Sequence, residues 1–183
     1  MSEFMEARDE SIDPIEDARR LIVLGHQGHG STAATGGKLT GWRRATRKGA
    51  WSGAHEWSAI WESVGSWADR LRCVLLECDD AHAIIGRWDG PRTLFYIDPP
   101  YVFSTRTSLN GYAHDMTDEQ HRQLAAELHA VRGMVILSGY PSDIYGELYR
   151  DWQRLDHAAV ADKGQMRTES IWLNAAAQTA RAA

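Results

Sequence analysis

The sequence predicts an α/β fold built on a mostly parallel sheet with helices on both faces. From about residue 72 onward, short apolar runs alternate with segments of helical pattern, as they do in strand–helix–strand units. The runs are apolar at consecutive positions, which is typical of strands that are buried on both faces of a parallel sheet. We expect the last two extended segments to form a C-terminal antiparallel hairpin.

The first predicted helix is marked by its capping residues. Residues 1–12 are rich in charge, and we expect them to form a flexible N-terminus. Asp13 suits the N-cap, Pro14 the first helical position and Glu16 the reciprocal capping position. The helix is expected to continue to about Leu24.

A second helix follows a long stretch without periodicity. Residues 25–53 are rich in Gly, Ser, Thr, Ala and basic side chains and show no helical or strand period, so we predict a long loop or mobile lobe. Apolar residues then recur at helical spacing and predict a helix over about 55–71, namely Trp57, Ile60, Trp61 and Val64. The tryptophans of this helix are interpreted as packing residues rather than as platforms for stacked bases.

Strands and capped helices alternate in the next part of the chain. Val74–Leu76 is predicted to be a short apolar strand, and Asp80 is predicted to cap the helix that follows. Thr93–Ile97, which is β-branched and aromatic, is predicted to be a strand that stops at Asp98. The two strands and the helix between them favour a parallel arrangement.

The alternation continues after a polar loop. Thr117–Gln120 has the pattern of a capping box, whose helix reaches about Val131 and ends at Gly133. The later predicted elements are a buried strand at 134–137, a short helix at 144–149 and two extended segments near 152–160 and 168–173.

The composition is that of an ordinary folded protein. With 183 residues, 43% hydrophobic and 25% charged, the chain has the size of one domain and can bury a core. The net charge of −5 argues against a uniformly basic nucleic-acid-coating protein, although a local basic patch is compatible with it. No stretch has the length of a membrane span and the start does not resemble a signal peptide, so we expect a reducing cytoplasmic setting. Cys73 and Cys78, which lack C-x-x-C spacing, are expected to be buried free thiols.

The tetrapeptide Asp98-Pro99-Pro100-Tyr101 is the best candidate for chemistry. It follows a predicted strand directly, and ligands of open parallel sheets bind beyond the carboxyl ends of the strands. Consecutive prolines stiffen the loop, so that a carboxylate and backbone carbonyls point in a fixed direction. Such acceptors suit the two hydrogens of an exocyclic amine such as N6 of adenine, and the aromatic ring could stack on a flipped base. The alternative is a turn in which Asp and Pro only end the strand.

Longer stretches around this loop carry a family resemblance. Leu94–Tyr101 and Tyr112–His121 resemble the catalytic loop and the following helix start of Dam-like adenine-N6 DNA methyltransferases, especially phage-encoded ones. Leu137–Ser142 and Thr168–Asn174 are similar to later strands of that group. The resemblance is best over residues 72–174. The tetrapeptide alone is shared with other amino-methyltransferases, whereas the whole run is much more specific.

The resemblance implies a partial Rossmann-like methyltransferase fold that uses S-adenosyl-L-methionine and acts on double-stranded DNA with a flipped adenine. Asp98 and Pro99 would accept the N6 hydrogens, Pro100 would stiffen the loop, and Tyr101 would stack on the adenine. Asp80 matches the acidic residue that meets the adenine end of the cofactor, so Asp80 and Asp98 are the predicted cofactor residues. A plain helix N-cap is the alternative for Asp80, and one side chain can serve both roles.

One expected part of such an enzyme is missing from the sequence. No F-x-G-x-G follows a strand, and the glycines of residues 25–30 follow a predicted helix instead. We therefore expect the chain to be the carboxyl-terminal portion of a longer or split enzyme. Without neighbouring strands, Thr93–Ile97 would keep an open apolar edge, which predicts pairing with a separately encoded N-terminal portion or self-association.

A basic cluster is the best candidate for contacts with DNA phosphates, because no acidic residue interrupts it and it falls where the family keeps its target-recognition region. Its members are Lys38, Arg43, Arg44, Arg47 and Lys48. A solvated loop with incidental charge is the alternative. Arg106 and Tyr112, beyond the catalytic loop, could touch the DNA strand near the extruded base.

Three parts and three functions are therefore predicted. Residues 1–12 form the flexible N-terminus, 13–71 a helical and basic DNA-recognition-like lobe, and 72–183 the catalytic portion. The leading function is adenine-N6 methylation of DNA; the alternatives are a non-catalytic DNA-binding remnant and an amino-methyltransferase that acts on RNA or protein. His26-x-x-His29 lacks a third ligand, so no metal site is predicted.

Overall fold

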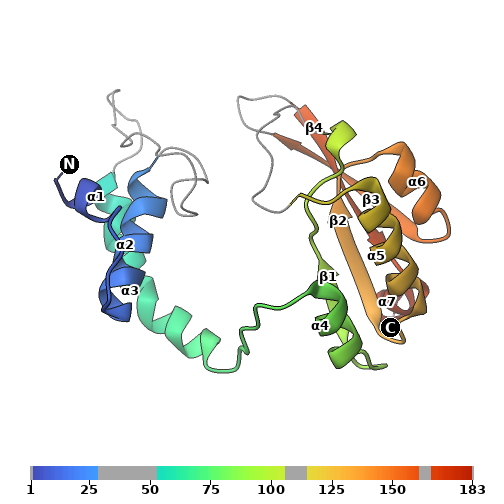
Figure 1. Cartoon of the computed structure of the whole chain (residues 1–183), viewed down its shortest axis with the longest axis horizontal. Helices are drawn as coiled ribbons and strands as arrows, with labels where there is room; N and C mark the ends of the chain where they lie inside the picture. Colours follow the sequence, from blue (N-terminus) through green and yellow to red (C-terminus); the bar gives the residue numbers. More distant parts are fainter. Residues whose placement is uncertain (1, 29–52, 106–114, 161–165, 183) are drawn as a thin grey trace. The chain divides into compact units, whose positions relative to one another are not determined.

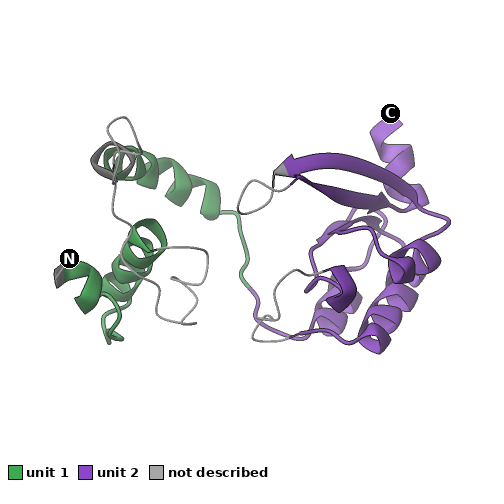
Figure 2. Cartoon of the chain, turned by 90° about the horizontal axis from the view of Figure 1, so that it is seen from above, with its two compact units in different colours: residues 1–76 green, residues 77–183 purple. Residues whose placement is uncertain are grey.

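A computed structural model describes residues 2–28, 53–105, 115–160 and 166–182 of the chain. The chain divides into two compact units, residues 1–76 and 77–183, which Figure 2 shows in different colours. In these described ranges, no helix combines the length and the apolar character that crossing a bilayer requires.

The first unit holds three described helices, α1 (Ser2–Glu6), α2 (Pro14–Gln27) and α3 (Gly53–Leu71). Asp13 caps α2 as predicted, since its carboxylate accepts the N–H of Ile15 at 2.9 Å. Within the predicted N-terminal segment, which was not expected to hold a helix, Phe4 of α1 is 1% exposed and packs with Val23 of α2. Burial of this aromatic side chain offsets the entropy of fixing a short terminal helix.

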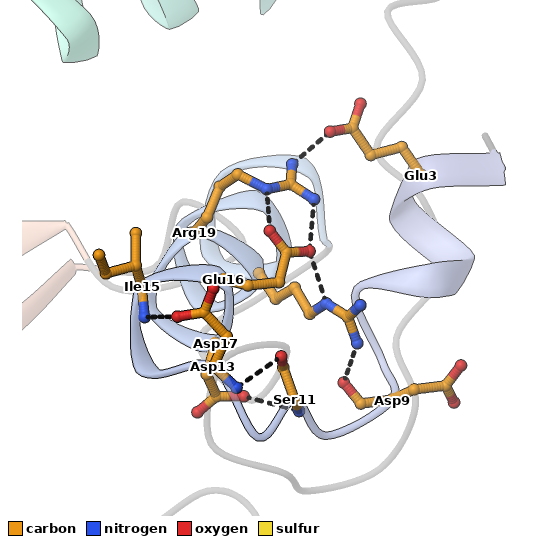
Figure 3. A network of polar contacts seen from close by, with 9 residues as sticks. Glu3, Asp9, Ser11, Asp13, Ile15, Glu16, Asp17 and Arg19 are labelled. Carbon is orange, nitrogen blue, oxygen red and sulfur yellow. Dashed lines mark hydrogen bonds and ion pairs between the residues drawn. The ribbon is translucent and has the colours of Figure 1, made fainter.

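A network of polar contacts ties α2 to the segment before it (Figure 3): Arg20 donates to the Asp9 carbonyl at 2.8 Å, and Arg19 pairs with Glu3 of α1. The Glu16 carboxylate accepts hydrogen bonds from Arg19 at 2.7 Å and from Arg20 at 2.8 Å. These bonds lower the pKa of Glu16 to about 2. The reciprocal capping role predicted for Glu16 is therefore wrong, and the Asp13 N–H donates to Ser11 Oγ at 3.2 Å instead.

The second unit is a four-stranded mixed sheet with helices (Figure 1). Its elements are α4 (Ala81–Trp88), β1 (Leu94–Ile97), the 3₁₀ turn η2 (Phe103–Thr105), α5 (Asp118–Ala130), β2 (Met134–Gly139), α6 (Asp143–Leu148), β3 (Gln153–Val160), β4 (Met166–Leu173) and α7 (Ala175–Ala182). The strand order is β1-β2-β4-β3.

The mostly parallel sheet was the main error in the predicted fold. Only β1 and β2 pair in parallel among the described strands, whereas β2 with β4 and β3 with β4 pair antiparallel. Consecutive apolar positions in β2 did reflect a strand that is at least half-buried on both faces, but its second neighbour is β4, which belongs to the C-terminal hairpin. That hairpin, and the mixed α/β class, are confirmed.

The strand predicted at Val74–Leu76 is also wrong. These residues form neither helix nor strand, and Leu75 and Leu76 are 70% and 86% exposed. No described strand pairs with them. An apolar run is stabilised as a strand only by hydrogen bonds to a neighbouring strand. Cys73 and Cys78 flank this segment; both thiols are free as predicted, but they are exposed rather than buried.

The core of the second unit lies between one face of the sheet and α4, α5 and α6. Phe95, Val135 and Trp172 come from the strands, and Leu128 and Tyr145 come from the helices. Both helix N-caps predicted here are confirmed: Asp80 accepts from His82 N at 3.0 Å, and the capping box of α5 is complete. On the opposite face of β1, Leu94 and Tyr96 are 55% and 64% exposed.

The helix α7 is not among the predicted elements. Asn174 caps it, because its Oδ1 accepts the N–H of Ala177 at 2.9 Å. The same side chain accepts from Val135 N at 3.1 Å and donates to the Gly133 carbonyl at 2.9 Å. Asn174 therefore holds the amino-terminal end of β2, which is the end away from the loop of residues 98–101.

Candidate active site

The Asp-Pro-Pro-Tyr loop begins where two parallel strands end side by side. β1 ends at Ile97, which is in register with Leu137 of β2, so Asp98 comes alongside Ser138. Asp98 is exposed, whereas Pro99 is buried. The loop thus presents its carboxylate at the carboxyl ends of the two parallel strands, and ligands of open α/β sheets bind at such ends.

Ser138 contacts the Asp98 carboxylate directly. The Ser138 hydroxyl donates a hydrogen bond to Asp98 Oδ1 with an oxygen–oxygen distance of 2.7 Å. Ser138 itself is 9% exposed. Sequence reasoning did not assign it to the site, because its neighbour across the sheet depends on the strand register rather than on any local motif.

Tyr101 is held by an aromatic neighbour from the segment after β2. Its ring meets that of Tyr140 edge to face, with the ring centroids 4.8 Å apart and the planes at 69°. The guanidinium carbon of Arg167, from β4, lies 5.4 Å from the centroid of Tyr140. The Tyr101 ring is therefore packed in an aromatic group rather than exposed without neighbours in a loop.

A buried tyrosine lies beneath this part of the site. Tyr145 is 1% exposed, and its hydroxyl is 3.2 Å from Nδ1 of His121. Burial raises the pKa of the Tyr145 phenol, and the nearby Asp98 carboxylate raises it further. The phenol therefore stays protonated near neutral pH and adds no charge beside Asp98.

The larger cavity beside the loop has a volume of about 710 Å³. Its lining includes Asp80, Ile84 and Ile85 from the start of α4, and Phe95, Asp98 and Pro99 from β1 and the loop. This volume lies in the range of small-molecule sites, which combine apolar walls with a few polar groups. Asp80 and Asp98 are thus brought to one cavity; the capping role of Asp80 is observed, and its cofactor role stays a prediction.

A smaller cavity of about 260 Å³ shares Tyr96 and Asp98 with the larger one. Its other walls include Tyr101 and Ser138, together with Glu169 from the C-terminal hairpin. A molecule in each cavity would therefore have Asp98 as a common neighbour. That arrangement suits the transfer of a group between two bound molecules.

The charged rim of the smaller cavity comes from β3 and β4. Asp156 accepts hydrogen bonds from Arg154 at 2.7 Å and from the Ser170 hydroxyl at 2.6 Å. The Arg154 guanidinium and the Ser170 hydroxyl lower the pKa of Asp156. This wall of the cavity therefore carries a paired, ionised carboxylate at neutral pH.

The residues predicted to contact DNA lie outside the described residues. They are Lys38, Arg43, Arg44, Arg47 and Lys48 in the basic cluster, and Arg106 and Tyr112 beyond the Asp-Pro-Pro-Tyr loop. Their DNA-binding role stays a prediction.

Comparison with known proteins identifies the family. No curated protein matches the chain significantly. The family model described as D12 class N6 adenine-specific DNA methyltransferase matches residues 62–163, which is more than half of the 183 residues. The match includes α4, the Asp-Pro-Pro-Tyr loop and β2, so the predicted resemblance to Dam-like adenine methyltransferases is confirmed. The chain therefore belongs to the D12 class N6 adenine-specific DNA methyltransferase family.

Proposed function

We propose that this chain transfers a methyl group from S-adenosyl-L-methionine to the N6 amino group of adenine in double-stranded DNA. Membership of an adenine-specific DNA methyltransferase family supports the reaction class. The observation that carries the assignment of the site is that Asp98, at the end of β1, lines both cavities.

The catalytic loop has acceptors suited to an amine. The Asp98 carboxylate and the Pro99 carbonyl accept hydrogen bonds from the two N–H groups of N6. These bonds leave the nitrogen lone pair more available for attack on the methyl carbon. Pro99 and Pro100 restrict the backbone, so little reorganisation is needed during the reaction. Tyr101, already fixed against Tyr140, stacks on the flipped adenine.

The larger cavity is the proposed cofactor site. Asp80, Asp98, Ile84 and Ile85 line this cavity. Asp80 would hold the adenine end of S-adenosylmethionine, Asp98 would face the reacting end, and the two isoleucines would contribute apolar wall. The cofactor would supply an electrophilic methyl group: as the bond from N6 to the methyl carbon forms, the methyl–sulfur bond breaks to leave S-adenosylhomocysteine, and N6 gives up one proton. The fit is partial, because the sequence contains no F-x-G-x-G through which backbone could approach the methionine end.

The DNA contacts are assigned to the basic residues. The cluster from Lys38 to Lys48 supplies phosphate contacts, and Arg106 and Tyr112 contact the strand near the extruded base. Phosphate contacts set affinity and register without reading the sequence of the DNA.

The open edge of β1 is the proposed site of self-association. Among the described strands β1 pairs only with β2, so no described strand pairs with the backbone donors and acceptors of its other edge. Leu94, a residue of this edge strand, is 55% exposed, and a partner that covered it would remove its apolar side chain from water. A second copy of the chain is the occupant available in the purified protein, and a separately encoded amino-terminal portion would compete with it.

The function is tested with the variant Asp98→Ala and the control Asp151→Ala. Asp151 is also an exposed aspartate of the second unit, but it contacts His129 at 3.8 Å and lines neither cavity. Incorporation of tritiated methyl into an adenine-containing duplex should be abolished by Asp98→Ala and kept by Asp151→Ala, with DNA affinity little changed in both.

Turnover of Asp98→Ala within a few-fold of wild type would contradict the assignment. A wild-type protein that binds DNA but transfers no methyl group, alone or together with a separately encoded amino-terminal portion, would favour the non-catalytic DNA-binding function. Methylation of RNA or protein in place of DNA would identify the remaining alternative.

A further inference from the structure

The backbone alone does not fix the orientation of the Asp98 carboxylate. It is exposed, and the torsion that turns a carboxylate about its last carbon–carbon bond has a broad energy profile. The stiff proline backbone fixes where the side chain starts, but it does not fix where the two oxygens point. Ser138 supplies a contact that can do this, because its hydroxyl donates to Oδ1 at 2.7 Å.

We propose that Ser138 is a positioning residue, whose hydroxyl holds Oδ1 of Asp98 so that Oδ2 is presented to the target amino group. This inference rests on the proposed function, because it assigns a partner to the catalytic carboxylate. The hydrogen bond is charge-assisted, and such bonds are shorter and stronger than bonds between neutral groups. One carboxylate oxygen is thereby engaged by the protein, and the other serves the substrate.

Ser138 is itself well fixed. β2 is an inner strand between β1 and β4, with Leu137 opposite Trp172 and Ser138 opposite Ile171. Ser138 is 9% exposed and lines the smaller cavity, so water competes with its hydroxyl less than it would at an open surface. The Ser138 hydroxyl, fixed on a neighbouring strand, can therefore hold the exposed Asp98 carboxylate in one orientation.

The same segment contacts the catalytic loop a second time. Two residues after Ser138, the ring of Tyr140 packs against Tyr101. Between them, Gly139 leaves room for the ring of Tyr145, since a Cβ there would lie only 2.9 Å from Cε2 of that ring. The end of β2 therefore supports both the carboxylate and the aromatic end of the Asp-Pro-Pro-Tyr loop.

A purely structural role for Ser138 makes a different prediction. Buried hydroxyls are hydrogen-bonded as a rule, so the contact with Asp98 would then serve only to satisfy the serine. In that case Ser138→Ala would lower the thermal stability of the protein without lowering the rate of methyl transfer. A positioning role requires the rate to fall while the enzyme stays folded.

The first experiment separates rate from stability. Ser138→Ala should lower kcat at least about tenfold and leave KM for DNA and for S-adenosylmethionine within about twofold. Ser138→Thr, which keeps the hydroxyl, should recover most of kcat. The control Asn174→Ala removes hydrogen bonds at the opposite end of the same strand and should lower Tm without lowering kcat.

The second experiment does not depend on activity. Thermal unfolding is measured for Ser138→Ala, Asp98→Ala and the double variant, whose shifts in Tm should be non-additive because each single change removes the same bond. Additive shifts, or wild-type kcat in Ser138→Ala, would overturn the proposal. A wild-type protein without methyl transfer would refute the proposed function, and the additivity of the Tm shifts would still decide whether Ser138 holds Asp98.

Discussion

Replacement of Gly139 by alanine tests how closely the end of β2 packs. The added Cβ would lie 2.9 Å from Cε2 and 3.6 Å from Cδ2 of Tyr145, and 3.7 Å from Cζ3 of Trp172. Tyr145 and Trp172 are 1% and 2% exposed, so neither ring can withdraw into solvent. Overpacking of this kind costs about 1–3 kcal/mol of unfolding free energy. In a unit of this size each kcal/mol lowers Tm by about 4–8 °C.

Gly146→Ala is the matched control for this prediction. Gly146 lies in α6, and a Cβ there meets nothing within 4 Å. Alanine is the better helix former, so this variant should be stabilised by about 0.5–1 kcal/mol. Thermal and urea unfolding, followed by circular dichroism, measure both variants. A Gly139→Ala protein within about 0.5 kcal/mol of wild type, or one no less stable than Gly146→Ala, would refute the packing argument.

The remaining predictions concern DNA, cofactor and pH. Neutralising the basic residues should weaken DNA binding and reduce the slope of log affinity on log salt by about 0.9 per lost contact, and an unchanged slope would assign them to a solvated loop; the residues to change are Arg43, Arg44, Arg47 and Lys48. The purified chain should bind S-adenosylmethionine weakly in calorimetry and self-associate in sedimentation, whereas low-micromolar binding by a monomer would contradict this. Because the pKa of Glu16 is lowered from 4.5 to about 2, its contribution to stability is complete above pH 4.5 and is lost as pH falls toward 2. Acid unfolding of Glu16→Gln should lack this component, and wild-type pH dependence in that variant would count against the ion-pair network.

Three helix starts were predictable from the sequence. Asp13, Asp80 and Thr117 were identified as N-caps from the sequence, and each accepts the expected backbone N–H in the structure. Capping depends on groups two or three residues apart, so the sequence contains both partners of the interaction. Glu16 shows the limit of this argument, because the arginines of the next turn offer it a stronger partner than the backbone.

Strand positions were predictable, but their neighbours were not. The runs at β1 and β2 were located correctly, yet β4 joins β2 in antiparallel orientation, and Val74–Leu76 remains outside the sheet. An apolar run shows that a segment suits burial, while its pairing depends on which other segments reach it. Phe4 was missed for a related reason, since its helix is stabilised by packing on α2.

Some features of the candidate site could be predicted from the sequence, and others depend on the tertiary structure. The sequence by itself determined the stiff loop from Asp98 to Tyr101 and the cap at Asp80, because proline geometry and capping act between adjacent residues. Only the tertiary structure decided that Asp80 and Asp98 line one cavity and that Ser138 donates to Asp98. Those contacts join residues far apart in the chain, and they depend on strand register and helix packing, which the whole fold sets cooperatively.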